Sequence, residues 1–261
     1  MDVRLRRVAV AALACSAAFA AHAAHAAALS VECGPPPSGA MCLDGPWFEF
    51  ATLTVDVTQG EARSRYGLTV ASGRDLLATI EEANPNYRGR AEVLLIDGSL
   101  VAEKSDRSLP SAGADLLNDP LLAAQEVASL LQLALPRGPR KVTKATPVRA
   151  AGTRILAMNT PGMSSYFGPP WTLEGSIAPR AKGAFAFELK LTYRIARPDG
   201  TLTDREHAHR YTGRVGYPAR RPRLPDSTPL AGWRIEAPGG ALLEFPTLGA
   251  ARRTLGVAPP R

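Results

Sequence analysis

Two histidines, His207 and His209, are the residues whose type and spacing most directly suggest chemistry. They are the only histidines outside residues 1–27. On a β-strand both rings would face the same side of the sheet, because side chains alternate along a strand. Such a pair could ligate a metal ion, act as a general base, form an ordinary polar lining of the sheet, or be core residues with satisfied hydrogen bonds. A closed metal site needs further ligands that the sequence does not identify, so we predict no metal site and favour the lining.

No other motif in the sequence indicates catalysis or a cofactor. The chain contains no G-x-S-x-G elbow, no G-x-G-x-x-G, no P-loop and no H-E-x-x-H pattern. We therefore expect no catalytic residue and no cofactor. A periplasmic hydrolase or metalloenzyme that uses His207 and His209 is our third hypothesis. The carboxylates have the pattern of surface, turn and cap residues: Glu81, Glu82, Asp97, Asp106, Asp115 and Asp119.

The histidines belong to the clearest pattern in the chain, a two-residue alternation of apolar and polar residues between 183 and 217. A turn at Pro198-Asp199-Gly200 divides it into two strands. Their apolar face is either an ordinary core or the wall of a cavity, since a curved sheet with few helices can enclose space. The candidate ligand-binding residues on this face are Phe185, Phe187, Leu189, Leu191, Tyr193, His207, His209 and Tyr211.

Charges favour one pairing of these two strands. If Glu188 lies opposite Arg210 and Arg194 opposite Asp204, two favourable cross-strand pairs form. His207 then faces Leu191, and His209 faces Leu189. The register two residues further on is disfavoured, because it places Lys190 against Arg210.

The other elements must support this hairpin. Strands are predicted over 47–57, 65–71, 90–96, 99–104, 142–148 and 154–159, with a loop over 160–170. Residues 75–82 could be a strand or a short helix. Asp97-Gly98 is a strong hairpin signal. One helix is predicted over 120–135, with Asp119 as its N-cap and Pro120 at its first position.

These elements predict an α+β fold with a curved, mostly antiparallel β-sheet, an incomplete barrel with one principal covering helix. We expect a single β-rich domain over 47–237. Residues 28–46 would form a disulfide-stapled segment before it, and residues 238–261 a poorly ordered tail rich in Pro, Gly and Arg after it.

Residues 1–27 have the three parts of a secretory signal peptide. Arg4, Arg6 and Arg7 precede an apolar run over 8–21, and Ala-x-Ala cleavage sites follow. We therefore predict export to the periplasm through a cleavable signal. A lipid anchor on Cys15 is the weaker alternative. The run is shorter than the about 20 residues that a membrane span needs, so we expect no transmembrane helix.

After the leader only Cys33 and Cys42 remain. An even count in an oxidising compartment predicts one disulfide between them. A redox-active pair usually has the closer Cys-x-x-Cys spacing, so a structural role is favoured.

The formal net charge is +7. Basic proteins can bind nucleic acid, but these arginines are scattered and the aromatic residues that stack on bases are sparse. We therefore expect no nucleic-acid partner. The cluster Arg220-Arg221-Pro222-Arg223 could contact an acidic partner, and a solvated loop is the favoured alternative.

The order of these elements resembles the LolA-like carriers, periplasmic proteins that hold lipoprotein acyl chains in an incomplete antiparallel barrel covered by helices. The resemblance covers strands within 47–71, the hairpin at Val93-Leu-Leu-Ile-Asp-Gly98, the helix over 120–135 and strands within 171–217. It implies non-catalytic binding of a lipid, a lipoprotein acyl chain or another hydrophobic small molecule. The alternative is an accessory factor that binds another protein of an envelope assembly.

Overall fold

The computed structural model describes residues 46–72, 75–84, 87–97, 100–106, 113–152, 156–160, 163–196, 201–236 and 241–256. The predicted signal peptide, Cys15 and the predicted Cys33–Cys42 disulfide lie outside the described residues. Within these ranges, no helix has the length and apolar character needed to cross a membrane.

The described strands form one antiparallel sheet in the order β12-β11-β5-β4-β3-β2-β1-β10-β9-β8-β6, with β7 paired to β8 outside this path. It is curved and does not close into a barrel, which confirms the predicted fold class. The strands are β1 (Thr52–Gln59), β2 (Ala62–Val70), β3 (Leu76–Asn84), β4 (Tyr87–Ile96), β5 (Leu100–Ser105), β6 (Thr146–Gly152), β7 (Leu156–Thr160), β8 (Met163–Pro179), β9 (Ala184–Ala196), β10 (Leu202–Gly216), β11 (Arg234–Glu236) and β12 (Leu242–Leu243).

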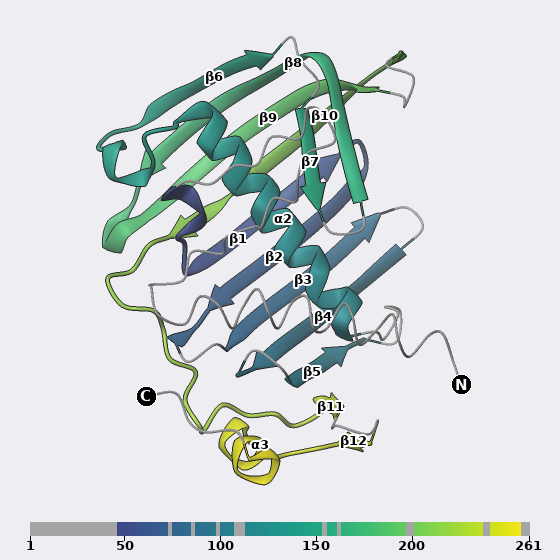
Figure 1. The fold of residues 1–261 in the computed structure, drawn as a ribbon, viewed down its shortest axis with the longest axis vertical. Helices are drawn as coiled ribbons and strands as arrows, with labels where there is room; N and C mark the ends of the chain where they lie inside the picture. Colours follow the sequence, from purple (N-terminus) through teal and green to yellow (C-terminus); the bar gives the residue numbers. More distant parts are fainter. Residues whose placement is uncertain are drawn as a thin grey trace.

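One long helix, α2 (Gly113–Ala134), crosses one face of the sheet, which we call the inner face (Figure 1). The helix begins earlier than its predicted start, and Pro120 lies inside it. Leu116 and Leu117, which precede the proline, are buried in the core. Their burial explains the longer helix, because tertiary packing readily overrides local start signals.

The inner face is tightly packed at the end formed by the short 3-10 turn η1 (Pro46–Phe48). Trp47 contacts Phe185 and Tyr217 edge to face, with ring centroids 5.8 Å and 6.1 Å away. Its indole Nε1 donates to the carbonyl of Leu135 at 2.8 Å, and the Tyr217 hydroxyl donates to the carbonyl of Trp47 at 2.7 Å. The strand predicted from residue 47 therefore starts only at Thr52.

The register of β9 and β10 differs from the predicted one. Leu202 faces Ala196, as the prediction requires, but the register then shifts before Glu206. Beyond this bulge His207 lies opposite Tyr193, His209 opposite Leu191, and Arg210 opposite Lys190. A surface charge pair is worth only about 0.2–1 kcal/mol, whereas a fully buried large side chain contributes about 1.5–3 kcal/mol. The predicted charge pairs are therefore too weak to fix the register by themselves.

Residues 160–170, predicted as a loop, contribute to strands instead. Strand β8 begins at Met163 and pairs with β7 over its first part. Its pairing with β9 is irregular between Gly168 and Thr172. Figure 1 shows that this first part bends away from the direction of the other strands.

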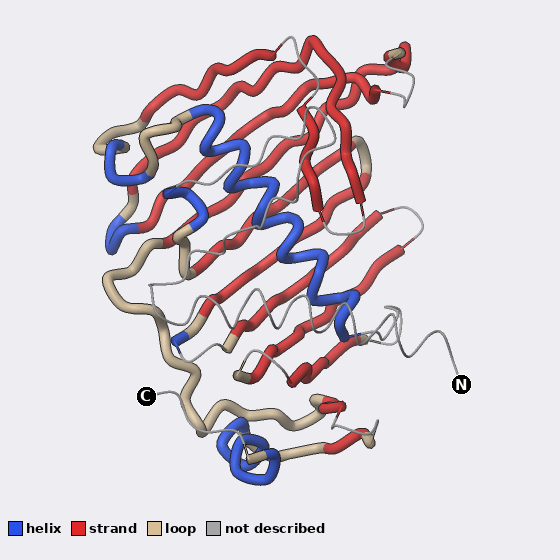
Figure 2. Tube along the Cα trace, viewed as in Figure 1, coloured by secondary structure: helices blue, strands red, loops and turns tan. Residues whose placement is uncertain are grey.

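The C-terminal segment packs on the outer face, which is the face opposite α2. Residues 241–256, expected within a disordered tail, include β12 and helix α3 (Leu248–Leu255), visible beside β11 in Figure 2. Leu248 and Ala251 of this segment belong to a second apolar cluster. Its other members are Leu94, Ile96, Ala102, Leu230, Trp233 and Ile235. In this part of the sheet both faces are therefore buried, and the expectation of a tail was wrong for these residues. The remaining short turns are η3 (Pro139–Lys141) and η4 (Ala181–Gly183).

Candidate functional site

A chain of hydrogen bonds connects α2 to strands β9 and β10 on the inner face. The Tyr211 hydroxyl donates a short hydrogen bond to the carboxyl group of Glu126 on α2. His209 Nδ1 lies 3.1 Å from the same hydroxyl, and His209 Nε2 lies 3.2 Å from the Tyr193 hydroxyl. We call these four residues, together with His207, the Tyr–His–Glu cluster.

His207 extends this cluster toward the edge of the inner face. Its ring stacks on Tyr193, with centroids 5.6 Å apart and an interplanar angle of 22°. Its Nδ1 atom lies 3.5 Å from Nε2 of Gln59 at the end of β1. His207 and His209 are only partly buried, whereas Tyr193 and Tyr211 are buried. The cluster therefore runs from the core to the surface.

Local sequence explains why these groups meet. Alternation along β9 and β10 directs Tyr193, His207, His209 and Tyr211 to the same face of the sheet. On α2, Glu126 follows Ala123 by three residues and precedes Leu130 by four, so it lies on the stripe that packs on the sheet. A carboxyl group is thus placed where the helical pattern otherwise calls for an apolar side chain.

Burial disfavours the charged forms of Glu126, Tyr193, His209 and Tyr211. It raises the pKa of Glu126, although the hydrogen bond from Tyr211 acts in the opposite direction. It also raises the pKa of Tyr193 to about 12 and that of Tyr211 well above its ordinary value. The pKa of His209 is lowered by burial and by the neighbouring His207. Both effects favour the neutral imidazole of His209, which has one donor and one acceptor nitrogen.

Further acidic and phenolic groups lie beside the cluster. Burial raises the pKa of Tyr66 to about 12. The charges of Glu82, Asp119 and Glu126 also raise this pKa, and the hydrogen bond with Ser64 lowers it. Burial and the charge of Asp119 likewise raise the pKa of Glu82. This neighbourhood disfavours an additional negative charge.

The predicted site residues divide into two groups. Phe185, Phe187, Leu189 and Leu191 are buried members of the main core cluster. Tyr193, His207, His209 and Tyr211 make the polar cluster. The inner face thus changes from apolar core to hydrogen-bonding groups along the same two strands.

Sequence reasoning missed Glu126 and Gln59, although both complete the cluster. Glu126 left a signal, since it interrupts the apolar stripe of the predicted helix. Its pairing with Tyr211, 85 residues away in the chain, left none.

The arrangement can bind a hydrogen-bonding group and can pass a proton along the chain of hydroxyl, imidazole and carboxyl groups. Among the described residues, no group of three or more His, Cys, Asp and Glu side chains is placed to hold a metal ion.

No family model, curated protein or solved structure matches this chain. Function must therefore be inferred from the geometry of the site, and the resemblance to LolA-like carriers stays a prediction.

Proposed function

We propose that the protein is an exported, non-catalytic binding protein of the periplasm that holds a lipid, an acyl chain or another hydrophobic small molecule. The ligand would be amphipathic. Its polar group would occupy the partly exposed end of the Tyr–His–Glu cluster, beside His207 and His209. The observation that carries the proposal is the change along β9 and β10 from buried Leu191 to the half-buried histidines.

The cluster favours an uncharged polar group on this ligand. Both ring nitrogens of His209 already lie at hydrogen-bond distance from Tyr193 and Tyr211. The ligand would therefore bond to the imidazole of His207 or to the hydroxyl oxygen of Tyr193, which suits an ester, amide or hydroxyl group. An anionic group would meet the nearby carboxyl groups of Glu82, Asp119 and Glu126. A carboxylate or phosphate at this position is therefore disfavoured.

The apolar part of the ligand would extend along the inner face from the cluster. Side chains there come from the sheet and from α2, the long helix that covers this face. Sites for small hydrophobic ligands typically combine mostly apolar walls with a few oriented polar groups.

A direct test combines native mass spectrometry of the purified protein with binding of a fluorescent fatty-acid ester. We expect an apolar molecule to co-purify and the probe to compete with it. Tyr193→Phe and His207→Phe should each weaken probe binding about fivefold, the effect of one lost hydrogen bond.

Thr192→Val is the matched control, since Thr192 lies on the same strand with the opposite orientation. Binding should be unchanged in this variant. The proposal is contradicted if the wild-type protein binds neither molecule. It is also contradicted if Thr192→Val loses as much affinity for the probe as the site variants do.

A further inference from the structure

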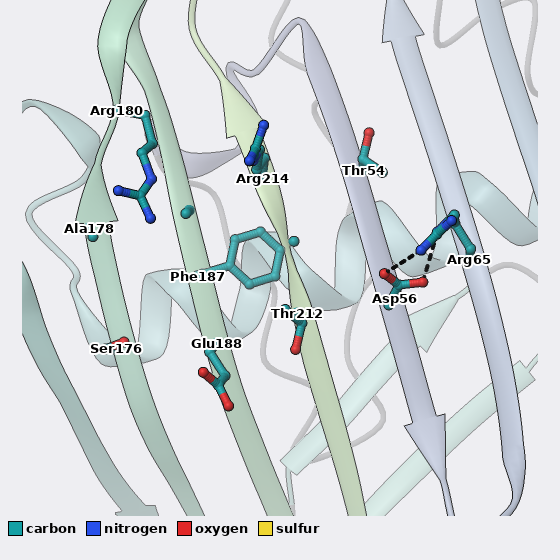
Figure 3. A pocket seen from close by; sticks show the side chains of 12 residues that line it. Thr54, Asp56, Arg65, Ser176, Ala178, Arg180, Phe187, Glu188, Thr212 and Arg214 are labelled. Carbon is teal, nitrogen blue, oxygen red and sulfur yellow. Dashed lines mark hydrogen bonds and ion pairs between the residues drawn. The ribbon is translucent and has the colours of Figure 1, made fainter.

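A polar groove crosses the outer face of the sheet, away from the Tyr–His–Glu cluster. Its main hollow has a volume of about 620 Å³ and extends from β8 across β9, β10 and β1 to β2. A smaller hollow of about 260 Å³ adjoins it, since Ser176 and Glu188 line both. We call the two together the outer groove, and Figure 3 shows its larger part.

Positive charge gathers at two places in this groove. Arg180 and Arg214 line the main hollow and stand on either side of β9 (Figure 3). Lys190 and Arg210 line the smaller one, together with the carboxylates of Glu174 and Glu188. Arg214 and Arg210 are four residues apart on β10, which corresponds to about 13 Å along a strand. All four side chains are exposed, and none makes an ion pair with another described residue.

The small residues Ala178 and Ala186 occupy the strand positions between the two arginines at the first end. Ala178 faces Ala186 across β8 and β9, and Ala186 faces Arg214 across β9 and β10. No long side chain of these strands therefore fills the space between the guanidinium groups of Arg180 and Arg214.

The second end contains a like-charge pair. Lys190 lies directly opposite Arg210, an arrangement that destabilises a sheet. Glu174 flanks Lys190 on the other side, but the other neighbour of Arg210 is the uncharged Thr58. Asp56 and Arg65, which also line the main hollow, pair with each other through two hydrogen bonds of 2.8 Å and 3.0 Å. Arg210 and Arg214, by contrast, have no carboxylate as a cross-strand neighbour.

Two glycines bring backbone into the bottom of the groove. A Cβ atom on Gly175 would lie 1.9 Å from the carbonyl oxygen of Glu188, and one on Gly213 would lie 2.2 Å from that of Thr54. Both glycines line the hollows. Backbone therefore forms part of the bottom, with the hydroxyl groups of Ser176 and Thr212 beside it.

We propose that the outer groove binds a ligand with two or more separated phosphate groups. One phosphate lies between Arg180 and Arg214, and another lies against Lys190 and Arg210. Glu188 lines both hollows between these ends and repels a single anion placed at the centre. The groove therefore binds an anion whose charges are spread along the strands more tightly than it binds a single compact anion.

Such phosphates can belong to a free molecule or to the headgroups of a lipid surface. Two probes separate these sources: long-chain inorganic polyphosphate in solution, and vesicles that contain phosphatidylglycerol, with phosphatidylcholine vesicles as the uncharged comparison. We expect the full chain to bind at least one anionic probe at low ionic strength, and added salt to weaken that binding. Binding of polyphosphate alone assigns a free ligand, and binding of vesicles alone assigns a lipid surface.

Variants locate the binding. Lys190→Gln and Arg210→Gln should each reduce affinity about fivefold. Arg90→Gln is the matched control, because it removes the same charge from a residue outside the groove that is already paired with Glu92 at 2.9 Å. Glu188→Gln should increase the affinity for inorganic phosphate, a gain that misfolding does not produce.

Two results would overturn the inference. One is failure of the folded protein to bind polyphosphate or anionic vesicles at low salt. The other is a loss of affinity in Arg90→Gln equal to that in Lys190→Gln and Arg210→Gln, which would indicate unspecific attraction to a basic protein.

Discussion

Glu126 is the residue on which the inner face depends, because it places a carboxyl group between a helix and a sheet. Its partner is the Tyr211 hydroxyl, and the phenolic groups of Tyr66 and Tyr193 are electrostatically coupled to it. In the neutral form the carboxyl group accepts the hydrogen bond from Tyr211 and leaves no buried charge. In the ionised form it is a poorly solvated charge, and no lysine, arginine or histidine among the described residues forms an ion pair with it.

We predict that Glu126→Gln makes the protein more stable at pH 8 than the wild type. A carboxyl group whose pKa is raised by folding contributes stability below its unfolded pKa of about 4.3, and this contribution is lost as the pH rises through the folded value. The free energy of unfolding, measured with urea from pH 4 to pH 8, should decline in the wild type relative to the variant. Glu61→Gln, at an exposed turn, is the control, and an identical pH dependence in wild type and Glu126→Gln contradicts the prediction.

Residue types alone indicated part of this site. Alternation in the sequence places Tyr193, His207, His209 and Tyr211 on one face, and the structure agrees. The partnership with Glu126 could not be predicted, because it depends on how α2 lies across the sheet. Single-residue spacing carries no information about that crossing.

Strands β8 and β9 approach closely at the smaller hollow of the outer groove, and Gly175 makes this approach possible. It has a φ angle of 148°, in a region that other residues rarely adopt. We predict that Gly175→Ala destabilises the protein by about 2–3 kcal/mol, from the strained backbone and the contact with the carbonyl of Glu188.

Gly60 provides a matched comparison for this prediction. It also has a positive φ, of 58°, but nothing lies within 4 Å of an added Cβ atom. Gly60→Ala should therefore lower the free energy of unfolding, measured by urea denaturation, by only about 1 kcal/mol. Equal losses in the two variants would show that the close approach of the strands is unimportant.

Helix α3 is fixed to the sheet by a buried arginine. Arg252 is 3% exposed and forms ion pairs with Asp226 and with Asp75, which is 1% exposed. Asp75 also accepts a hydrogen bond from the backbone N–H of Asp97 at 2.9 Å. Three segments that are distant in sequence therefore meet at one guanidinium group.

We predict that Arg252→Met destabilises the protein by about 3–5 kcal/mol, because Asp75 is left buried without its cation. Arg253→Met is the control, since Arg253 is the exposed neighbour on the same helix. Chemical denaturation should show the loss only in Arg252→Met. Adding Asp75→Asn to Arg252→Met should recover part of the lost stability. If Arg252→Met is as stable as the wild type, this account of the contact is contradicted.

The elements were predicted unevenly, for physical reasons. Strong two-residue alternation and Asp97-Gly98 identify β9 and the β4–β5 hairpin, because both signals are local. The bulge after Leu202 and the early start of α2 depend on contacts with distant residues. Helix α3 has a local signal in Thr247, whose side chain accepts from the Ala250 N–H, but the Pro and Gly content around it obscured that signal.

At the scale of the molecule, the sheet separates two surfaces of different chemistry. The inner face carries an apolar core that ends in neutral hydrogen-bonding groups, and the outer face carries a C-terminal cover beside a basic groove. Sequence patterns predicted the class of fold. The pairing of β1 with β10, which joins the two halves of the sheet, could not be read from them.

The most direct test of the central claim is the NMR spectrum of the imidazole groups with and without a bound fatty-acid ester. The chain has 4 histidines, so the signals of His207 and His209 can be assigned with single variants. We predict that ligand binding shifts both signals, and that of His209 in particular, because its hydrogen bond with Tyr193 lies at the site. A bound ligand that leaves both signals unchanged would contradict the proposed site.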